Sequence, residues 1–432
     1  MEPHLPARAL SRLPDAEDLP GPAARRAARA GLYVHVPFCA TRCHYCDFSS
    51  GPISRLAVER YLAGLEREAE LRAGSADGLS FSSVFLGGGT PSLLSADRFR
   101  RLWQALASRF AIDRDAEITL EANPESVSAP RAAAWAECGV NRLSLGAQSF
   151  DDGELERLGR IHRAERLVEA VAVARAQGYR RLSLDLMFGF PWHERGRWRR
   201  TLERALALDP GHLSAYCFIP EPGTPLGEAV LRGEEVLPSD EEQAESYEEL
   251  MARGAAAGYG GYETSNLCRP GEEARHNLVY WLRRPYVGLG PSAHGLAGGE
   301  RYGNHYSLAR WASALERGEP PEEERETVRP EDVAREVLLL GLRLGSGVRR
   351  EDHIPAVWEM VAARYGSAWE RGLATGRLER AGDGVRIPPA LRFVADDVIA
   401  WVDAEADRAS FDRLSAGSVT SHPCQKWPSP AA

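Results

Sequence analysis

The sequence predicts an α/β fold: a partial (β/α)6 barrel followed by a C-terminal α+β region. Six short apolar runs between residues 32 and 218 alternate with longer segments of helical periodicity. Such alternation indicates parallel strands joined by right-handed helical crossovers. Six units are fewer than the eight of a closed barrel, so we expect an open one. Ligands of such folds bind at the carboxyl ends of the strands, and the chemically unusual residues of this chain follow those ends.

The predicted strands are short, rich in β-branched or apolar residues, and often closed by Gly or Pro. In chain order they are LYVHV from Leu32, SVFLG from Ser83, EITLEA from Glu117, RLSLG from Arg142, RLSLDLMF from Arg181 and HLSAYCF from His212. The clearest helical patterns cover residues 57–73 and 151–178, where apolar side chains recur at i, i+3 and i+4. We expect the second to be one helical stretch, with Asp151 as its N-cap and Gly178 just past its end.

The predicted barrel spans residues 31–230, and residues 231–320 form an extension that contains the segment HNLVYW. Residues 321–405 are helical and then contain GRLERAGDGVRIP, which predicts a β-hairpin with its turn near Gly382 to Gly384. Helices followed by a hairpin suggest a small winged-helix-like module. By composition, residues 1–30 are predicted to be a disordered leader and residues 406–432 a disordered tail.

The composition argues against several classes of protein. A net charge of −9 is unlike a protein that grips nucleic acid, which would present a basic face. No apolar run reaches the roughly 18 residues of a membrane span, and residues 1–30 lack the apolar core of a secretory signal. Seven cysteines, three of them clustered, are unlike the framework of a small disulfide-bonded domain. We therefore expect a cytoplasmic protein whose clustered cysteines serve a metal or catalysis.

The cysteine cluster lies in CATRCHYCDF, directly after the first predicted strand, and consists of Cys39, Cys43 and Cys46. Closely spaced thiolates bind zinc or an iron–sulfur cluster. Structural zinc takes four ligands, commonly as two spaced pairs; the second pair is missing, although His35 or His44 would complete a zinc site. A cubane [4Fe–4S] cluster usually takes four thiolates. With three, one iron is left open to a substrate or cofactor.

Further candidate residues follow the next strands. Gly87, Gly88 and Gly89 in FLGGGTPSLL permit close approach of backbone to a ligand, although a tight turn alone would explain one of them. Glu121, at the end of strand three, is suited to bind ribose hydroxyls, with a solvated acid as the alternative. The remaining candidates are Gln148 after strand four, Arg160 in the following helix and Asp185 within strand five, where a buried charge needs a function or a partner.

Together these segments resemble a known family. LYVHVPFCATRCHYCDF, FLGGGTPSLL, GVNRLSLGAQSFDDGELERLGRIH, DLMFGFP and PEPGTPL are similar to the radical S-adenosylmethionine (SAM) superfamily, and within it to oxygen-independent coproporphyrinogen oxidases and their relatives. The resemblance covers about residues 31 to 400. It implies that the three cysteines hold a [4Fe–4S] cluster and that SAM binds its open iron. The implied SAM contacts are Tyr33, Gly88, Gly89, Thr90, Glu121, Gln148, Arg160 and Asp185.

Two features distinguish the branch. Decarboxylating members typically carry another Cys two residues after the third, where this chain has Phe48. The segment HNLVYW, from His276 to Trp281, resembles the motif of HemW-type haem chaperones. This branch implies haem as cargo, contacted by His276, Tyr280 and Trp281, and delivered to a haem-accepting protein such as a respiratory enzyme. Any membrane association would then come through that partner alone, and coproporphyrinogen decarboxylation is not expected.

Alternatives stay open at this point. A decarboxylating oxidase uses the same cluster, and a buried core histidine with aromatic neighbours would equally explain His276. His294 is a second candidate haem ligand, and Cys268 is more simply a buried thiol. The run RGRWRR from Arg195 would suit porphyrin carboxylates, although a solvated helix face is the default interpretation.

Overall fold

The computed structural model describes residues 29–415, which divide in sequence into two compact units, the first ending at Val328 and the second beginning at Arg329. Most of the predicted leader, residues 1–28, and the end of the predicted tail, residues 416–432, lie outside the described residues. Residues 29 and 30 already belong to the first strand.

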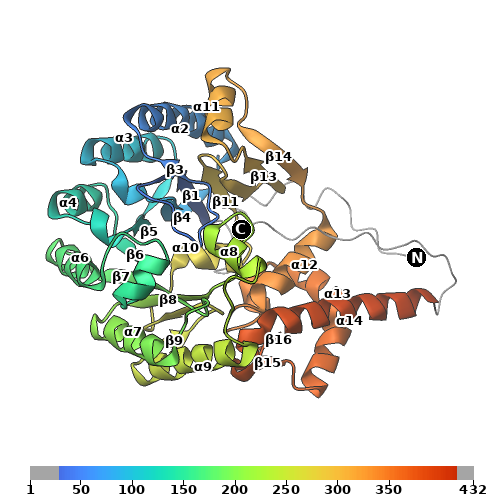
Figure 1. Ribbon diagram of the computed structural model, residues 1–432. Coiled ribbons are helices and arrows are strands. Elements are labelled where there is room, and N and C mark those ends of the chain that lie inside the picture. Colours follow the sequence, from blue (N-terminus) through green and yellow to red (C-terminus); the bar gives the residue numbers. More distant parts are fainter. Residues whose placement is uncertain (1–28, 416–432) are drawn as a thin grey trace. The chain divides into compact units, whose positions relative to one another are not determined.

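The first unit is built on a twelve-stranded sheet (Figure 1). Its central strands are the six predicted ones, parallel and adjacent in sequence order: β1 (Arg29–Val36), β4 (Ser80–Gly88), β5 (Ile112–Ala122), β6 (Arg142–Gln148), β7 (Arg181–Phe188) and β8 (His212–Cys217). A seventh parallel strand, β11 (Tyr286–Leu289), pairs with the free side of β1. The predicted fold class is therefore confirmed.

Shorter antiparallel strands extend both edges of this sheet. Beyond β11 lie β12 (His294–Ala297), β13 (Glu300–Asn304) and β14 (Glu322–Thr327), and beyond β8 lie β10 (Asn266–Cys268) and β9 (Gly260–Gly261). The sequence did not predict these strands, because they are two to six residues long and rich in Gly or charge. A separate short pairing joins β2 (Phe38–Cys39) to β3 (Gly51–Pro52).

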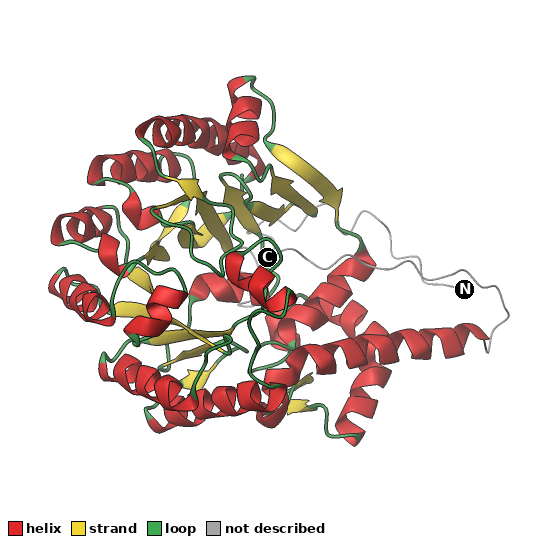
Figure 2. Cartoon of the chain, in the orientation of Figure 1, coloured by secondary structure: helices red, strands yellow, loops and turns green. Residues whose placement is uncertain are grey.

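Helices pack on the outer face of the parallel strands, as Figure 2 shows. They are α2 (Arg55–Ser75), α3 (Ala96–Ala107), α4 (Ala129–Glu137), α6 (Ala164–Ala176) and α7 (Arg195–Ala207). The apolar residues of each strand alternate toward them, as with the fully buried Leu32, Val34 and Val36 of β1. The alternate positions of neighbouring strands, such as Glu121, Ser144 and Asp185, therefore face the barrel interior. Further helices are α8 (Pro225–Leu231), α9 (Asp240–Ala256), α10 (Arg275–Trp281) and α11 (Leu308–Glu316).

The expected single helix at 151–178 is wrong. The chain forms α5 (Asp152–Arg157) and α6, and Arg160 lies in the turn between them rather than in a helix. The break falls at Gly159, whose φ of +76° favours glycine. A Cβ at Gly159 would also lie 2.9 Å from the His44 ring. Both predicted boundaries hold: Asp151 caps α5 through the amides of Gly153 and Glu154, and Gly178 has φ +90°.

The second unit is mainly helical, with α12 (Pro330–Gly341), α13 (Pro355–Ala374) and α14 (Ala395–Ser415). The predicted hairpin is present as β15 (Glu379–Ala381) paired antiparallel with β16 (Gly384–Arg386). Helix α14 continues past residue 405, so the predicted tail does not begin at residue 406. Within residues 29–415, no helix is both long and apolar enough to cross a membrane.

Candidate functional site

The cysteine loop leaves the carboxyl end of β1 and returns through the short β2–β3 pairing, which closes its base. Cys39, Cys43 and Cys46 are half-buried thiols that form no disulfide. Burial raises the pKa of the Cys46 thiol to about 11, and the nearby Cys43 and Cys39 add to that shift. The Cys46 thiol would lose its proton most readily to a bound metal.

A chain of hydrogen bonds joins two of the thiols through the loops that follow β4, β5 and β6. The Arg160 guanidinium donates from Nη1 to Cys43 Sγ at 3.4 Å and from Nη2 to Asn123 Oδ1 at 2.6 Å. Asn123 Nδ2 donates to Thr90 Oγ1 at 3.2 Å, and Thr90 Oγ1 lies 3.6 Å from Cys39 Sγ. The Arg160 guanidinium thus places a positive charge within hydrogen-bond distance of Cys43 Sγ. Asn123 was not among the predicted site residues, although it lies only two residues after Glu121.

The backbone of the glycine run, Gly87 to Gly89, lies against other parts of the protein. A Cβ at Gly89 would lie 2.6 Å from the carbonyl oxygen of Phe38, and one at Gly88 would lie 2.5 Å from the His35 ring. Gly88 also has φ +101°, in the left-handed region. The run is therefore required by its close approach to the start of the cysteine loop. Its contact with SAM stays a prediction.

Two acidic side chains face the barrel interior near this end. Burial raises the pKa of Glu121 to about 8, the charge of Asp185 adds to the shift, and the Gly88 amide opposes it by donating to Glu121 Oε2 at 3.1 Å. Burial also raises the pKa of Asp185 to about 6. Its partners are hydroxyl groups: Ser144 Oγ donates to it at 2.9 Å, and Ser183 Oγ lies at 3.5 Å. A ligand with hydroxyl donors would find two acceptors here.

Three side chains converge on Gly146 of β6. A Cβ at this position would lie 3.0 Å from Asn123 Oδ1 and 3.2 Å from both Arg160 Nη2 and Gln148 Nε2. Gln148 itself is buried and has φ +62°, which is uncommon for a residue with a side chain. Backbone strain of this kind gathers at functional sites. An open hollow beside Cys43 is lined by Thr41, Cys43, Asn123, Glu125, Arg160 and Ile161.

These residues fit an iron–sulfur cluster better than a single metal ion. In the described part of the chain, no three His, Cys, Asp or Glu side chains are gathered as ligands of one ion. A cubane binds each thiolate through a different iron, so its ligands need not converge on one point. Of the two histidines in the zinc alternative, His35 has both ring nitrogens bonded to the protein: Nδ1 bonds Tyr33 Oη at 3.0 Å and Nε2 bonds the Ser49 carbonyl at 2.7 Å. His44 is exposed and its Nδ1 bonds the Arg157 carbonyl at 2.9 Å.

The HNLVYW segment forms α10, which packs near the beginnings of β1 and β4 rather than at their carboxyl ends. His276 is 1% exposed. Its Nδ1 bonds Ser83 Oγ and its Nε2 bonds Tyr280 Oη, both at 2.9 Å, and burial lowers its pKa to about 3. Tyr280 and Trp281 are half-buried. Contact of haem with these three residues stays a prediction, and ligation by His276 would require one of the two hydrogen bonds to open.

The other candidates have ordinary surroundings. His294 is exposed on β12, 3.8 Å from Glu324, and Cys268 is buried in β10. Two arginines of RGRWRR pair with the acidic helix α9 from α7, Arg195 with Glu245 and Arg199 with Glu249, each at 2.8 Å. The side chains of Arg195 and Arg199 remain about half exposed, which agrees with the default interpretation of a solvated helix face.

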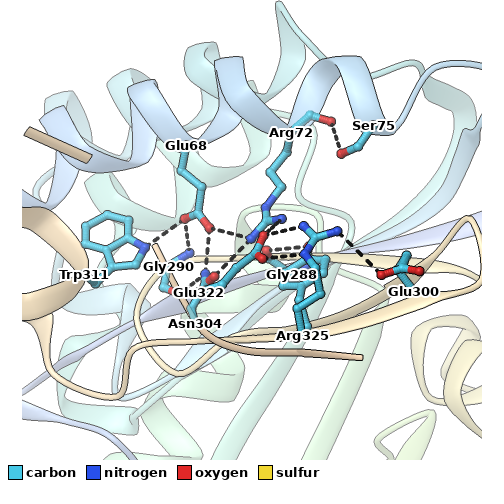
Figure 3. A network of polar contacts seen from close by, with 11 residues as sticks. Glu68, Arg72, Ser75, Gly288, Gly290, Glu300, Asn304, Trp311, Glu322 and Arg325 are labelled. Carbon is cyan, nitrogen blue, oxygen red and sulfur yellow. Dashed lines mark hydrogen bonds and ion pairs between the residues drawn. The ribbon is translucent and has the colours of Figure 1, made fainter. Parts of the chain in front are cut away.

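A buried polar network, which we call the Glu68 clamp, ties the edge strands to the site (Figure 3). Glu68 on α2 accepts hydrogen bonds from the Gly290 amide at 2.7 Å, Asn304 Nδ2 at 2.6 Å and Trp311 Nε1 at 3.0 Å. Gly290 follows β11 and sits against β1, since a Cβ there would lie 2.4 Å from the His35 carbonyl oxygen. The clamp thus fixes the backbone that enters the cysteine loop.

The segment between β13 and α11 binds the end of the cysteine loop. Ser49 Oγ donates to the Tyr306 carbonyl at 2.8 Å, and Tyr306 Oη donates to the Asp47 carbonyl at 3.1 Å. Tyr306 lies in the segment between β13 and α11. Sequence reasoning placed this segment in the extension but gave it no part in the site, because pairing over 250 residues leaves no local pattern.

Comparisons with known proteins identify relatives of the chain in sequence and in fold. The model of the radical SAM superfamily matches residues 33–205. The chain is 36% identical to the heme chaperone HemW of Mycobacterium tuberculosis over 88% of this chain and 97% of that protein. It is 36% identical to the heme chaperone HemW of Bacillus subtilis over 74% of this chain and 84% of that one. Its fold is similar to that of coproporphyrinogen III oxidase from Escherichia coli, with a TM-score of 0.73, 22% identity, and 89% and 94% of the two chains covered.

A parallel partial barrel with three cysteines in the loop after its first strand places the chain in the radical SAM superfamily. Within that superfamily the chain belongs to the HemW family of heme chaperones, because it shares 36% identity with a HemW over nearly the whole length of that relative. The resemblance inferred from the sequence motifs is thereby confirmed.

Proposed function

We propose that the protein binds a [4Fe–4S] cluster, SAM and haem, and delivers haem to an acceptor protein. The observation that carries the cofactor part is the Cys43–Arg160–Asn123–Thr90–Cys39 chain of contacts, which organises free thiols around a cation and an open hollow. The haem part is supported by the HemW names of the relatives. Free thiols of this kind persist in a reducing compartment, which favours the cytoplasm.

Each residue has a defined task in this proposal. Cys39, Cys43 and Cys46 would ligate three irons, and the fourth iron would take the amino and carboxylate groups of SAM, which is cofactor chemistry. Arg160 would neutralise the cluster ligand Cys43 and face the SAM carboxylate. Glu121 and Asp185 would accept hydrogen bonds from hydroxyl groups, and their mutual repulsion favours a shared proton or a bound donor.

Haem delivery is tested on the anaerobically reconstituted protein. The protein is loaded with haem, mixed with the haem-free form of a respiratory haem protein, and followed by the Soret spectrum of the acceptor. We expect transfer at a rate above that from free haem at the same concentration. A rate equal to that from free haem would contradict delivery, even if haem binds.

The competing function is oxidative decarboxylation of coproporphyrinogen III, which the fold alone would allow. Phe48, half exposed where decarboxylating relatives carry a further Cys, argues against it. The test supplies SAM, a reductant and coproporphyrinogen III to the cluster-loaded protein. Mass spectrometry is expected to show no loss of the two propionate carboxyl groups. Stoichiometric loss of both would replace the chaperone proposal by an enzyme.

A further inference from the structure

The ring of His276 belongs to a cluster of three stacked or tilted rings inside the barrel, in which each ring lies next to the other two. It stacks on Phe85 with centroids 5.2 Å apart, Phe85 stacks on Tyr33 at 6.2 Å, and Tyr33 lies 6.4 Å from His276. Gly31 makes room for this arrangement, because a Cβ there would lie 3.0 Å from His276 Cε1. The His276 ring therefore packs directly against both the Tyr33 ring and the Phe85 ring.

Tyr33 links this cluster of rings to the cysteine loop through hydrogen bonds. Its hydroxyl bonds His35 Nδ1 at 3.0 Å, and His35 Nε2 bonds the Ser49 carbonyl at 2.7 Å. Ser49 follows Cys46 by three residues. The His35 ring also fills the space beside Gly88, at 2.5 Å from a Cβ built there. A continuous set of contacts thus runs from α10 through Tyr33 and His35 to both the cysteine loop and the glycine run.

We propose that His276 is a positioning residue for the SAM and cluster pocket and not an iron ligand of haem. It would pack against the Tyr33 and Phe85 rings. Through Tyr33 and then His35, it would fix the loops that follow β1 and β4. This inference rests on the SAM and cluster pocket of the proposed function, but not on haem delivery.

The surroundings of the His276 nitrogens support this assignment. Both nitrogens already bond protein hydroxyls, those of Ser83 and Tyr280, and the backbone amide of His276 lies 3.2 Å from Glu117 Oε1. Ligation of iron would expose a residue that is 1% exposed and would leave a buried hydroxyl without its partner. A haem ligand normally keeps one nitrogen free for iron while the other is held.

The experiment separates support from ligation. His276→Phe keeps a ring that stacks on Phe85 but cannot bind iron, and His276→Ala removes the ring. Val279→Ala is the matched control, because Val279 lies on the same helix and also faces Gly31, at 3.1 Å from a Cβ built there, without entering the stack. The dissociation constants of SAM and of haem are measured on each cluster-loaded variant, together with its melting temperature.

We expect His276→Ala to raise the SAM dissociation constant about tenfold, with His276→Phe and Val279→Ala within about threefold of the wild type. The haem dissociation constant and Soret spectrum should stay at the wild-type values in all three. If His276→Ala fails to fold, Ser83→Ala, which removes one anchor of the ring, provides the same readout with a smaller expected change.

Two results would overturn the inference. Weaker haem binding or an altered Soret spectrum in His276→Phe would make His276 a ligand. Equal loss of SAM affinity in His276→Ala and Val279→Ala would show general loss of packing under the pocket. If the wild type binds no haem at all, the proposed function fails while the SAM comparison still decides the role of His276.

Discussion

The two ends of the barrel differ in how far the rest of the protein encloses their candidate ligand side chains. At the cysteine end, thiols are free, Gln148 and Gly88 have left-handed backbones, and the side chains around Gly146 border an open hollow. At the α10 end, His276 has a protein partner on each ring nitrogen. The thiols of Cys39 and Cys43 are contacted by polar groups at the edge of a hollow, whereas the two ring nitrogens of His276 are enclosed by protein partners. The type of side chain alone does not decide this difference.

The largest expected effect is the loss of the cluster. Cys43→Ala removes one of the three thiolates, so the iron and sulfide content of the reconstituted protein should fall from about four of each per chain to near zero. Cys138→Ala, at the buried end of α4, is the matched control and should keep the full content. Retention of a complete cluster in Cys43→Ala would break the assignment of the cysteine end.

The next effect concerns the cation at that end. Arg160→Ala removes the bonds to Cys43, Asn123 and the Gly146 carbonyl, and hydrogen bonds to charged groups contribute about 1.5–3 kcal/mol each. We expect the SAM dissociation constant to rise at least about tenfold by calorimetric titration. Arg163→Ala, an exposed arginine on the same turn, should bind SAM as the wild type does. Equal losses in both variants would indicate a general charge effect.

A pH effect is expected from the Glu68 clamp. Burial raises the pKa of Glu68 to about 7, above its value in the unfolded chain. The folded state therefore binds more protons in this range, and the free energy of unfolding should fall as pH rises from about 5 to 8, by on the order of 2 kcal/mol. In denaturant titrations at several pH values, Glu68→Gln should show a smaller fall than the wild type, and the fall that remains is expected from the raised pKa values of Glu121 and Asp185. An unchanged pH dependence in Glu68→Gln would contradict the raised pKa.

The smallest effect is expected at His44. His44→Ala removes an exposed imidazole whose Nδ1 bonds the Arg157 carbonyl, and a cubane with three thiolates does not need it. Iron content should stay within about a tenth of the wild type. A large loss of metal, or zinc in place of iron by elemental analysis, would favour the structural zinc alternative.

The sequence predicted the barrel well because its strands are continuous apolar runs and its crossovers are long helices. It also placed the cysteine loop and the residues that follow the strands, since their position after each strand is a local feature. The prediction that Arg160 lies in a helix was wrong. Gly159 breaks an otherwise periodic segment, and the break brings the Arg160 guanidinium to Cys43. The sequence offered no sign of the Glu68 clamp, because Glu68 and Asn304 meet across 236 residues. It could not show that both nitrogens of His276 are occupied, since Ser83 is 193 residues away.

The central claim is that three thiolates of the cysteine end hold a cluster whose open iron binds SAM. The most direct measurement is the electron paramagnetic resonance spectrum of the reduced, cluster-loaded protein, recorded with and without SAM. We expect a [4Fe–4S] signal whose g values change when SAM is added. S-adenosylhomocysteine lacks the methyl group and the sulfonium charge. At equal concentration it leaves the g values unchanged only if binding needs that charge. A signal that SAM does not alter at saturating concentration would contradict the open iron.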